Sequence, residues 1–175
     1  VEVYGVGDEA ELIVNGISLG RKRVPQVSEG DSNAYSTVFD TVYQPGRIEA
    51  VLYRAGQETG RCALETASDR LQLLVEDQNG DAATDSKDLL YFMVSLTDGQ
   101  GILKPACDRE VRVSVRGAGM LQGFGSAAPL STECFTTGVF TTYYGKAALA
   151  VRPVGEGEIH IQVQAEGCDA VEIRL

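Results

Sequence analysis

Apolar and polar residues alternate along most of this chain. Val111, Val113 and Val115 are separated by charged or hydroxyl-bearing residues, and the segment 159–165 repeats the pattern with isoleucine, valine and alanine at every second position. A period of two places one face of a strand in a core and the other in water, which is typical of antiparallel sheets. We find no convincing run at helical spacing, so the pattern predicts an all-β chain.

Turn residues separate the alternating runs, as at Asn15-Gly16 and Asp98-Gly99. Many short strands with frequent turns are typical of a sandwich or a barrel. The runs predict strands at 2–4, 10–15, 17–24, 34–42, 48–53, 58–65, 70–76, 89–97, 110–116, 120–124, 147–152, 158–165 and 170–175.

A repeated hairpin divides the chain. Residues 46–56 can be laid over 157–167 without a gap, because both begin with glycine, carry apolar residues at alternate positions and reach a glycine ten residues later. In each copy a further strand follows, as in the last two strands of an immunoglobulin-like unit. The repeat predicts two tandem immunoglobulin-like β-sandwich domains, at 1–67 and, larger, at 68–175.

Composition narrows the classes of function. The 175 residues carry 25 acidic and 15 basic side chains, a net charge of −10, so the phosphate backbone of a nucleic acid would be repelled. No stretch reaches the roughly 20 apolar residues of a membrane span, and we expect no membrane partner. The strand-like start at Val1, without methionine, suggests a fragment of a longer chain and no signal peptide.

Four cysteines lie far apart, at positions 62, 107, 134 and 168. None forms a Cys-x-x-Cys pair and the single histidine is not spaced as a zinc partner, so we expect no cofactor. One cysteine falls in the first unit and three in the second, which predicts mostly free thiols, with a single disulfide left open. Free thiols favour a bacterial cytoplasm over secretion.

Asp77, Asn79 and Asp81 are the candidate metal ligands. Oxygen-bearing side chains at alternate positions are typical of calcium loops, but Ala82 and Asp88 replace the glycine and glutamate that such a loop needs. A solvated loop between two strands accounts for the same residues, and we expect no metal site.

The segment 135–144 carries Phe135, Phe140, Tyr143 and Tyr144 among threonines. Exposed aromatic rings stack on sugars or pack against a neighbouring module, whereas threonine and aromatic residues are also typical of strands. This long, weakly charged connection is therefore either a further strand or a docking surface. We expect at least one of the four residues to contact another module or a catalytic barrel, with packing in the unit's own core as the alternative.

Several short motifs follow one another in order. The first unit contains Asp-Glu-Ala-Glu-Leu-Ile-Val-Asn-Gly at 8–16 and Val-Tyr-Gln-Pro-Gly at 42–46, and the second contains Asp88-Leu89 before a long strand and a glycine-rich turn at 117–125. This order resembles the two modules that follow the catalytic barrel in family 2 glycoside hydrolases of the β-galactosidase type. The family usually has Asn-Gly where this chain has Ser126-Ala127, so no role is carried over to that loop.

The resemblance implies an accessory region and no catalytic residue. Retaining glycosidases use two carboxylates about 5–5.5 Å apart. In this family both are glutamates of the barrel, which would precede Val1, and no position here matches them. The resemblance therefore implies a non-catalytic C-terminal region that supports or flanks the barrel of its own parent chain. The alternative is a bacterial surface adhesion or carbohydrate-binding module, with carbohydrate as the partner.

Overall fold

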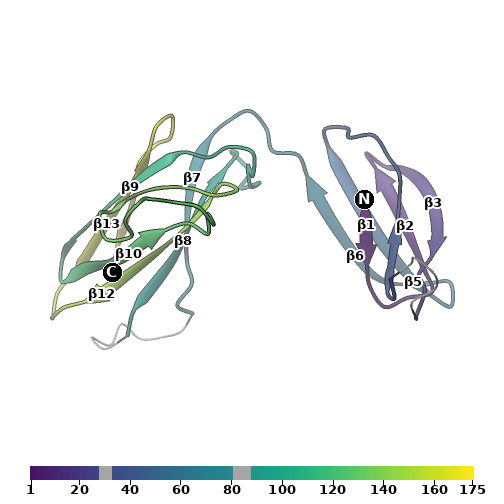
Figure 1. Ribbon diagram of the computed structural model, residues 1–175, viewed down its shortest axis with the longest axis horizontal. Helices are drawn as coiled ribbons and strands as arrows, with labels where there is room; N and C mark the ends of the chain where they lie inside the picture. The colour runs from purple at the N-terminus through teal and green to yellow at the C-terminus, as the bar shows by residue number, and fades with distance from the viewer. Residues whose placement is uncertain (28–32, 81–87) are drawn as a thin grey trace. The chain divides into compact units, whose positions relative to one another are not determined.

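The computed structural model describes residues 1–27, 33–80 and 88–175, and these residues form strands and turns but no helix. The prediction of an all-β chain is confirmed. The chain divides into two compact units, Val1–Thr66 (unit 1) and Ala67–Leu175 (unit 2), which Figure 1 shows in purple to blue and in teal to yellow. Within the described ranges no helix is long and apolar enough to cross a membrane.

Unit 1 is a four-stranded antiparallel sheet covered by a two-stranded one. The larger sheet has the order β3-β2-β5-β6, and β1 pairs with β4 in the smaller. The strands are β1 (Glu2–Tyr4), β2 (Glu9–Val14), β3 (Ile17–Arg23), β4 (Ser36–Val38), β5 (Arg47–Arg54) and β6 (Gln57–Glu65). Alternate residues of β2, namely Ala10, Leu12 and Val14, are buried against Val3 and Phe39, so the period of two in the sequence builds the core.

Two tight turns close the hairpins of unit 1. Asn15 and Gly16 between β2 and β3 have φ values of 48° and 81°, and Ala55 and Gly56 between β5 and β6 have 49° and 78°. Two-residue hairpin turns of this kind need positive φ at both positions, which asparagine and glycine adopt most easily. Asn15 also accepts a hydrogen bond from the Arg47 amide at 2.8 Å, which ties the first turn to β5.

Unit 2 is a sandwich of two four-stranded antiparallel sheets, with orders β10-β12-β8-β7 and β11-β9-β13-β14 (Figure 1). Its strands are β7 (Gln72–Asp77), β8 (Leu90–Thr97), β9 (Glu110–Gly117), β10 (Gly119–Gly125), β11 (Val139–Thr141), β12 (Lys146–Pro153), β13 (Ile159–Ala165) and β14 (Val171–Arg174). The largest fully buried side chains of its core are Phe92, Phe124, Phe140, Leu96, Leu149 and Ile161.

Two elements differ from the sequence expectation. The sequence predicts a strand at 34–42, but only the three residues of β4 form one. The long connection containing residues 135–144 is expected to be either a further strand or a docking surface, and it contains the short strand β11. β11 pairs with the edge of β9, and the Glu133 carboxylate accepts hydrogen bonds from the Thr141 amide and hydroxyl at 2.8 and 2.9 Å. Three residues carry too little alternation to predict a strand.

Candidate functional sites

The four aromatic residues of segment 135–144 lie in different surroundings. Phe140 on β11 is fully buried in the core of unit 2, whereas Phe135 is 57% and Tyr144 61% exposed. The Phe135 ring stacks on Phe140 with centroids 5.1 Å apart. The expectation of a docking or sugar-contacting residue is therefore corrected for Phe140, because β11 directs its side chain between the two sheets.

Tyr143 and Tyr144 belong to the turn between β11 and β12. Tyr143 is half-buried, and its ring meets that of Tyr144 edge-on with centroids 4.5 Å apart. Tyr144 and Gly145 have φ values of 50° and 71°, so Tyr144 occupies a left-handed turn position that favours glycine or asparagine. Phe135 and Tyr144 are the two exposed aromatic candidates that remain for a contact with another module.

Asp77 and Asn79 hold the end of β7 against the start of β8. The Asp77 carboxylate accepts hydrogen bonds from the Asn79 amide and side chain at 2.7 and 2.6 Å, and Asn79 Oδ1 accepts one from the Tyr91 amide at 2.7 Å. Asp81 lies outside the described residues. Among the residues that are described, no group of three or more histidine, cysteine or acidic side chains is arranged to hold a metal ion.

Asp98 is a buried carboxylate that the sequence presented only as a turn residue. Its oxygens accept hydrogen bonds from the backbone amides of Ser68, Gln100 and Ile102 at 2.8, 2.8 and 2.9 Å. These donors stabilise the charged form, led by Ser68, and lower the pKa of Asp98 from 3.8 to about 2. The carboxylate thus fixes the first residues of unit 2 to the end of β8.

The connection between the units is short. Thr66 donates its amide to Gly46 O at 2.8 Å within unit 1, and Ser68 is held by Asp98 within unit 2. Lys104 also donates a hydrogen bond to the Ser68 carbonyl. Ala67 is consequently the one residue between the last anchored position of unit 1 and the first of unit 2.

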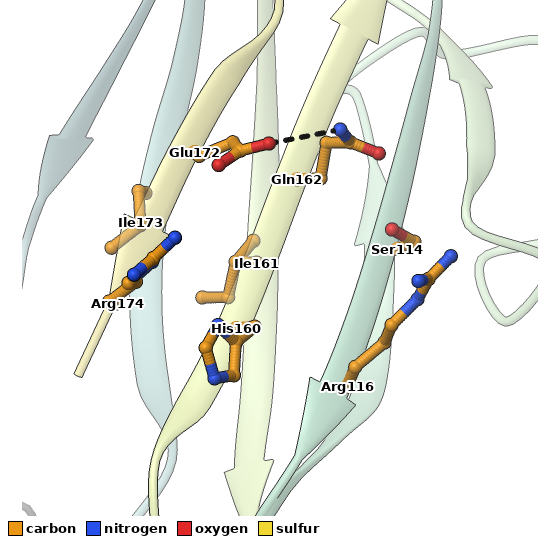
Figure 2. Close-up of a pocket in the computed structure, with 8 residues that line it drawn as sticks. All are labelled: Ser114, Arg116, His160, Ile161, Gln162, Glu172, Ile173 and Arg174. Atoms are coloured by element: carbon orange, nitrogen blue, oxygen red, sulfur yellow. Dashed lines mark hydrogen bonds between the residues drawn. The ribbon is translucent and has the colours of Figure 1, made fainter.

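The outer face of β9, β13 and β14 carries the most distinctive polar cluster of unit 2. We call it the β13 face, and Figure 2 shows its lining residues, of which the polar ones are Ser114, Arg116, His160, Gln162, Glu172 and Arg174. In the register of the sheet, His160 lies between Arg116 and Arg174, and Gln162 lies between Ser114 and Glu172. These side chains surround an open depression with a volume of about 260 Å³.

The arginines of the β13 face have no anionic partner within the described part of the chain. Glu172, two residues before Arg174, instead accepts a hydrogen bond from the side-chain Nε2 of Gln162 at 3.4 Å (Figure 2). His160 Nε2 lies 3.3 Å from the Glu158 carboxylate. Arg116 and Arg174 therefore present two guanidinium groups to solvent on either side of His160.

The outer face of the larger sheet in unit 1 has the opposite arrangement. We call it the unit 1 face, and three of its arginines, Arg21, Arg47 and Arg61, each lie within salt-bridge distance of glutamate. Arg61 contacts Glu49 at 3.3 Å and Glu58 at 3.0 Å, and hydrogen bonds to Glu58 and Glu49 raise its pKa. The other pairs are Arg21 with Glu9 and Glu11, and Arg47 with Glu49 and Glu65. Arg21 also lies 3.5 Å above the Tyr53 ring centroid.

All four cysteines are free thiols. Cys62 and Cys134 are exposed, whereas Cys107 and Cys168 are half-buried against the core of unit 2. Burial raises the pKa of the Cys168 thiol, and the neighbouring Cys107 adds to this effect. Cys168 is thus held in its protonated, less nucleophilic form at neutral pH.

The chain matches a known family over most of unit 2. The family model for glycoside hydrolase family 2 C-terminal domain 5 matches residues 71–174. The chain belongs to this family. The resemblance to a C-terminal accessory region of family 2 glycoside hydrolases is confirmed. A domain of unknown function, DUF4982, matches residues 1–60.

Relatives of this family 2 region are much longer than the chain. The chain is 27% identical to Beta-galactosidase BoGH2A of Bacteroides ovatus over 173 residues. The matched segment covers 98% of the chain and 20% of that protein. A putative beta-glucuronidase of Formosa agariphila is 27% identical over 89% of the chain and 15% of its own length. The chain spans 20% and 15% of the lengths of these two curated relatives.

A solved family 2 glycosyl hydrolase supports the same assignment. The crystal structure of a member from Bacteroides cellulosilyticus matches with a TM-score of 0.89 and 27% identity, over 99% of this chain and 23% of that one. The chain is therefore a C-terminal accessory region of the family, built of β-sandwiches.

Proposed function

We propose that this chain is the non-catalytic C-terminal region of a retaining, β-galactosidase-type glycoside hydrolase. The observation that carries the proposal is the family match over residues 71–174 in a chain that spans only 20% of a β-galactosidase relative. Both sandwiches are filled by their own side chains, such as Phe39 in unit 1 and Phe92 in unit 2. Filled sandwiches leave room for surface contacts rather than an enclosing active site.

The region supports or flanks the catalytic barrel of its own parent chain. Phe135 and Tyr144 are the aromatic candidates for this contact, since an exposed phenylalanine or tyrosine loses apolar surface to water when a neighbour covers it. The four free thiols support a reducing bacterial compartment, such as the cytoplasm, for the whole enzyme.

The test compares the isolated chain with the enzyme that contains it. The purified chain is expected to release no nitrophenol from nitrophenyl β-galactoside, whereas the longer enzyme turns it over. Replacing Phe135 or Tyr144 by serine is expected to leave the stability of the isolated chain nearly unchanged and to lower the melting temperature or activity of the longer enzyme. Turnover by the isolated chain that a single substitution abolishes would overturn the proposal.

A further inference from the structure

We infer that the β13 face binds an acidic saccharide, with Arg116 and Arg174 holding the carboxylate of a uronic acid unit. This goes beyond the proposed function, because it gives the accessory region a ligand of its own. It requires neither a catalytic barrel nor hydrolysis.

Charge is the first argument for an anionic ligand. The chain has 25 acidic side chains for 15 basic ones, so carboxylates are in excess as partners for arginine. Arg21, Arg47 and Arg61 of the unit 1 face have such partners, and on β9 itself Arg112 lies 2.7 Å from Glu110. Arg116 and Arg174 have no ion pair inside the described ranges, and this also holds for Arg54, Arg70, Arg109 and Arg152. What sets Arg116 and Arg174 apart is that they line one depression together. Guanidinium groups bind carboxylates in bidentate geometry, and here two such groups are available.

The spacing of the two arginines is the second argument. Both are register partners of His160, so their strands lie on either side of β13. With neighbouring strands roughly 4.8 Å apart, their Cα atoms are about 10 Å apart across the sheet. Figure 2 shows both side chains on the same side of the sheet with the imidazole between them. A carboxylate placed above β13 is within reach of both long side chains.

The remaining lining residues favour a sugar over other acids. The Ser114 hydroxyl, the Gln162 side-chain amide and the Glu172 carboxylate supply donors and acceptors for ring hydroxyls next to the two arginines. The depression of about 260 Å³ is small and open, which suits one or two pyranose rings lying on the sheet. An acidic peptide that binds as an added strand needs a sheet edge, and in this sheet it would pair beside β14, at the border of the face. It would not lie over β13, which is paired on both sides.

The experiment titrates the full chain with digalacturonate, its dimethyl ester and tetraglutamate, followed by NMR chemical shifts or calorimetry. Digalacturonate is expected to bind in the millimolar range, and the neutral ester at least tenfold more weakly. Arg116→Gln and Arg174→Gln are each expected to weaken binding at least fivefold, and added salt to weaken it further. Arg112→Gln is the matched control, because Arg112 lies on the same strand but is paired with Glu110.

Three results would overturn the inference. Equal binding of the ester would show that the carboxylate is not recognised. Binding of tetraglutamate without digalacturonate would assign the face to an acidic protein instead. An equal loss in the Arg112→Gln control would show only general attraction to positive charge. All of these readouts are independent of hydrolysis, so the proposed accessory role in an enzyme stands or fails separately.

Discussion

The unit 1 face and the β13 face are both exposed polar surfaces of antiparallel sheets, yet their charges are arranged differently. On the unit 1 face arginine and glutamate alternate across neighbouring strands, and Glu49 serves both Arg47 and Arg61. On the β13 face two arginines lie on either side of a histidine, and Glu172 bonds to a neutral amide. The comparison teaches that exposure and polarity do not distinguish a structural surface from a binding surface. The two faces differ in whether arginines that lie close together are paired with glutamate.

The internal pairs of the unit 1 face have a local purpose. Arg21 covers the Tyr53 ring, and hydrogen bonds from Ser18 and Tyr53 lower the pKa of Glu11. These contacts shield Val51, which is fully buried although it points to the outer side of the sheet. Exposed ion pairs contribute little stability individually, so their main consequence is that Arg21, Arg47 and Arg61 are already occupied by glutamates.

The largest predicted effect tests whether the two faces belong to independent folding units. Phe140→Ala removes a fully buried ring from unit 2 and is expected to destabilise that unit by about 3–5 kcal/mol. Unit 1 shares no core cluster with Phe140, so its transition in a denaturant titration is expected to stay in place. Phe135→Ala, which removes a largely exposed ring, is the control and is expected to cost far less. A joint shift of both transitions would contradict the division into two units.

The next effect concerns acid stability, which is expected to differ between the units. Because the pKa of Asp98 is about 2 when folded and 3.8 ordinarily, its contribution is complete above about pH 5 and is lost as the pH falls towards 2. Asp98→Asn is expected to lower the melting temperature of unit 2 by several degrees at pH 6 and by much less at pH 2.5. Glu156→Gln, at an exposed carboxylate of the same unit, is the control in calorimetry at both values. An equal loss from Asp98→Asn at the two pH values would exclude a role for its charge.

A third substitution is designed to make the β13 face resemble the unit 1 face. Ser114→Glu places a carboxylate two residues before Arg116, as Glu110 precedes Arg112 on the same strand. The new ion pair is expected to lower digalacturonate affinity at least fivefold while the melting temperature changes little. The control is Ser114→Gln, which introduces a side chain of the same size as glutamate but without its charge. It is expected to retain most of the binding in the same titration. Equal losses in the two variants would assign the effect to shape instead of charge.

Local patterns in the sequence predicted most of the strands but few of the contacts between them. The alternation around Val113 and Ile161 sufficed because side-chain direction in a strand depends only on the local period. The same alternation predicted that Arg116 and His160 face water, yet their pairing depends on the register between β9 and β13, which no local motif encodes. For the aromatic residues the local pattern itself was insufficient. Phe140 is buried because it lies on β11, and a strand of three residues is too short to be predicted from alternation.

Asp98 illustrates the same limit for a single residue. In the sequence it precedes Gly99 and predicts only a turn, which the structure also contains. Its bond to Ser68, thirty residues earlier, arises only when the start of unit 2 lies beside the end of β8. Long-range hydrogen bonds of this kind need tertiary structure before they can be seen.

The smallest predicted effect compares the two hairpins of unit 1. Asn15 and Ala55 occupy equivalent turn positions with φ values of 48° and 49°, but only asparagine is suited to this left-handed conformation. Ala55→Asn is therefore expected to stabilise unit 1 by about 0.5 kcal/mol, because the short polar side chain of asparagine can hydrogen-bond locally and so offset part of the cost of about 1–2 kcal/mol of this conformation. Asn15→Ala is the reciprocal change and is expected to destabilise unit 1 by more, because it also removes the hydrogen bonds to Pro45 and Arg47. Chemical denaturation of both variants measures the difference. A loss of stability in Ala55→Asn would show that the side chain at position 55 is constrained by something other than its backbone conformation.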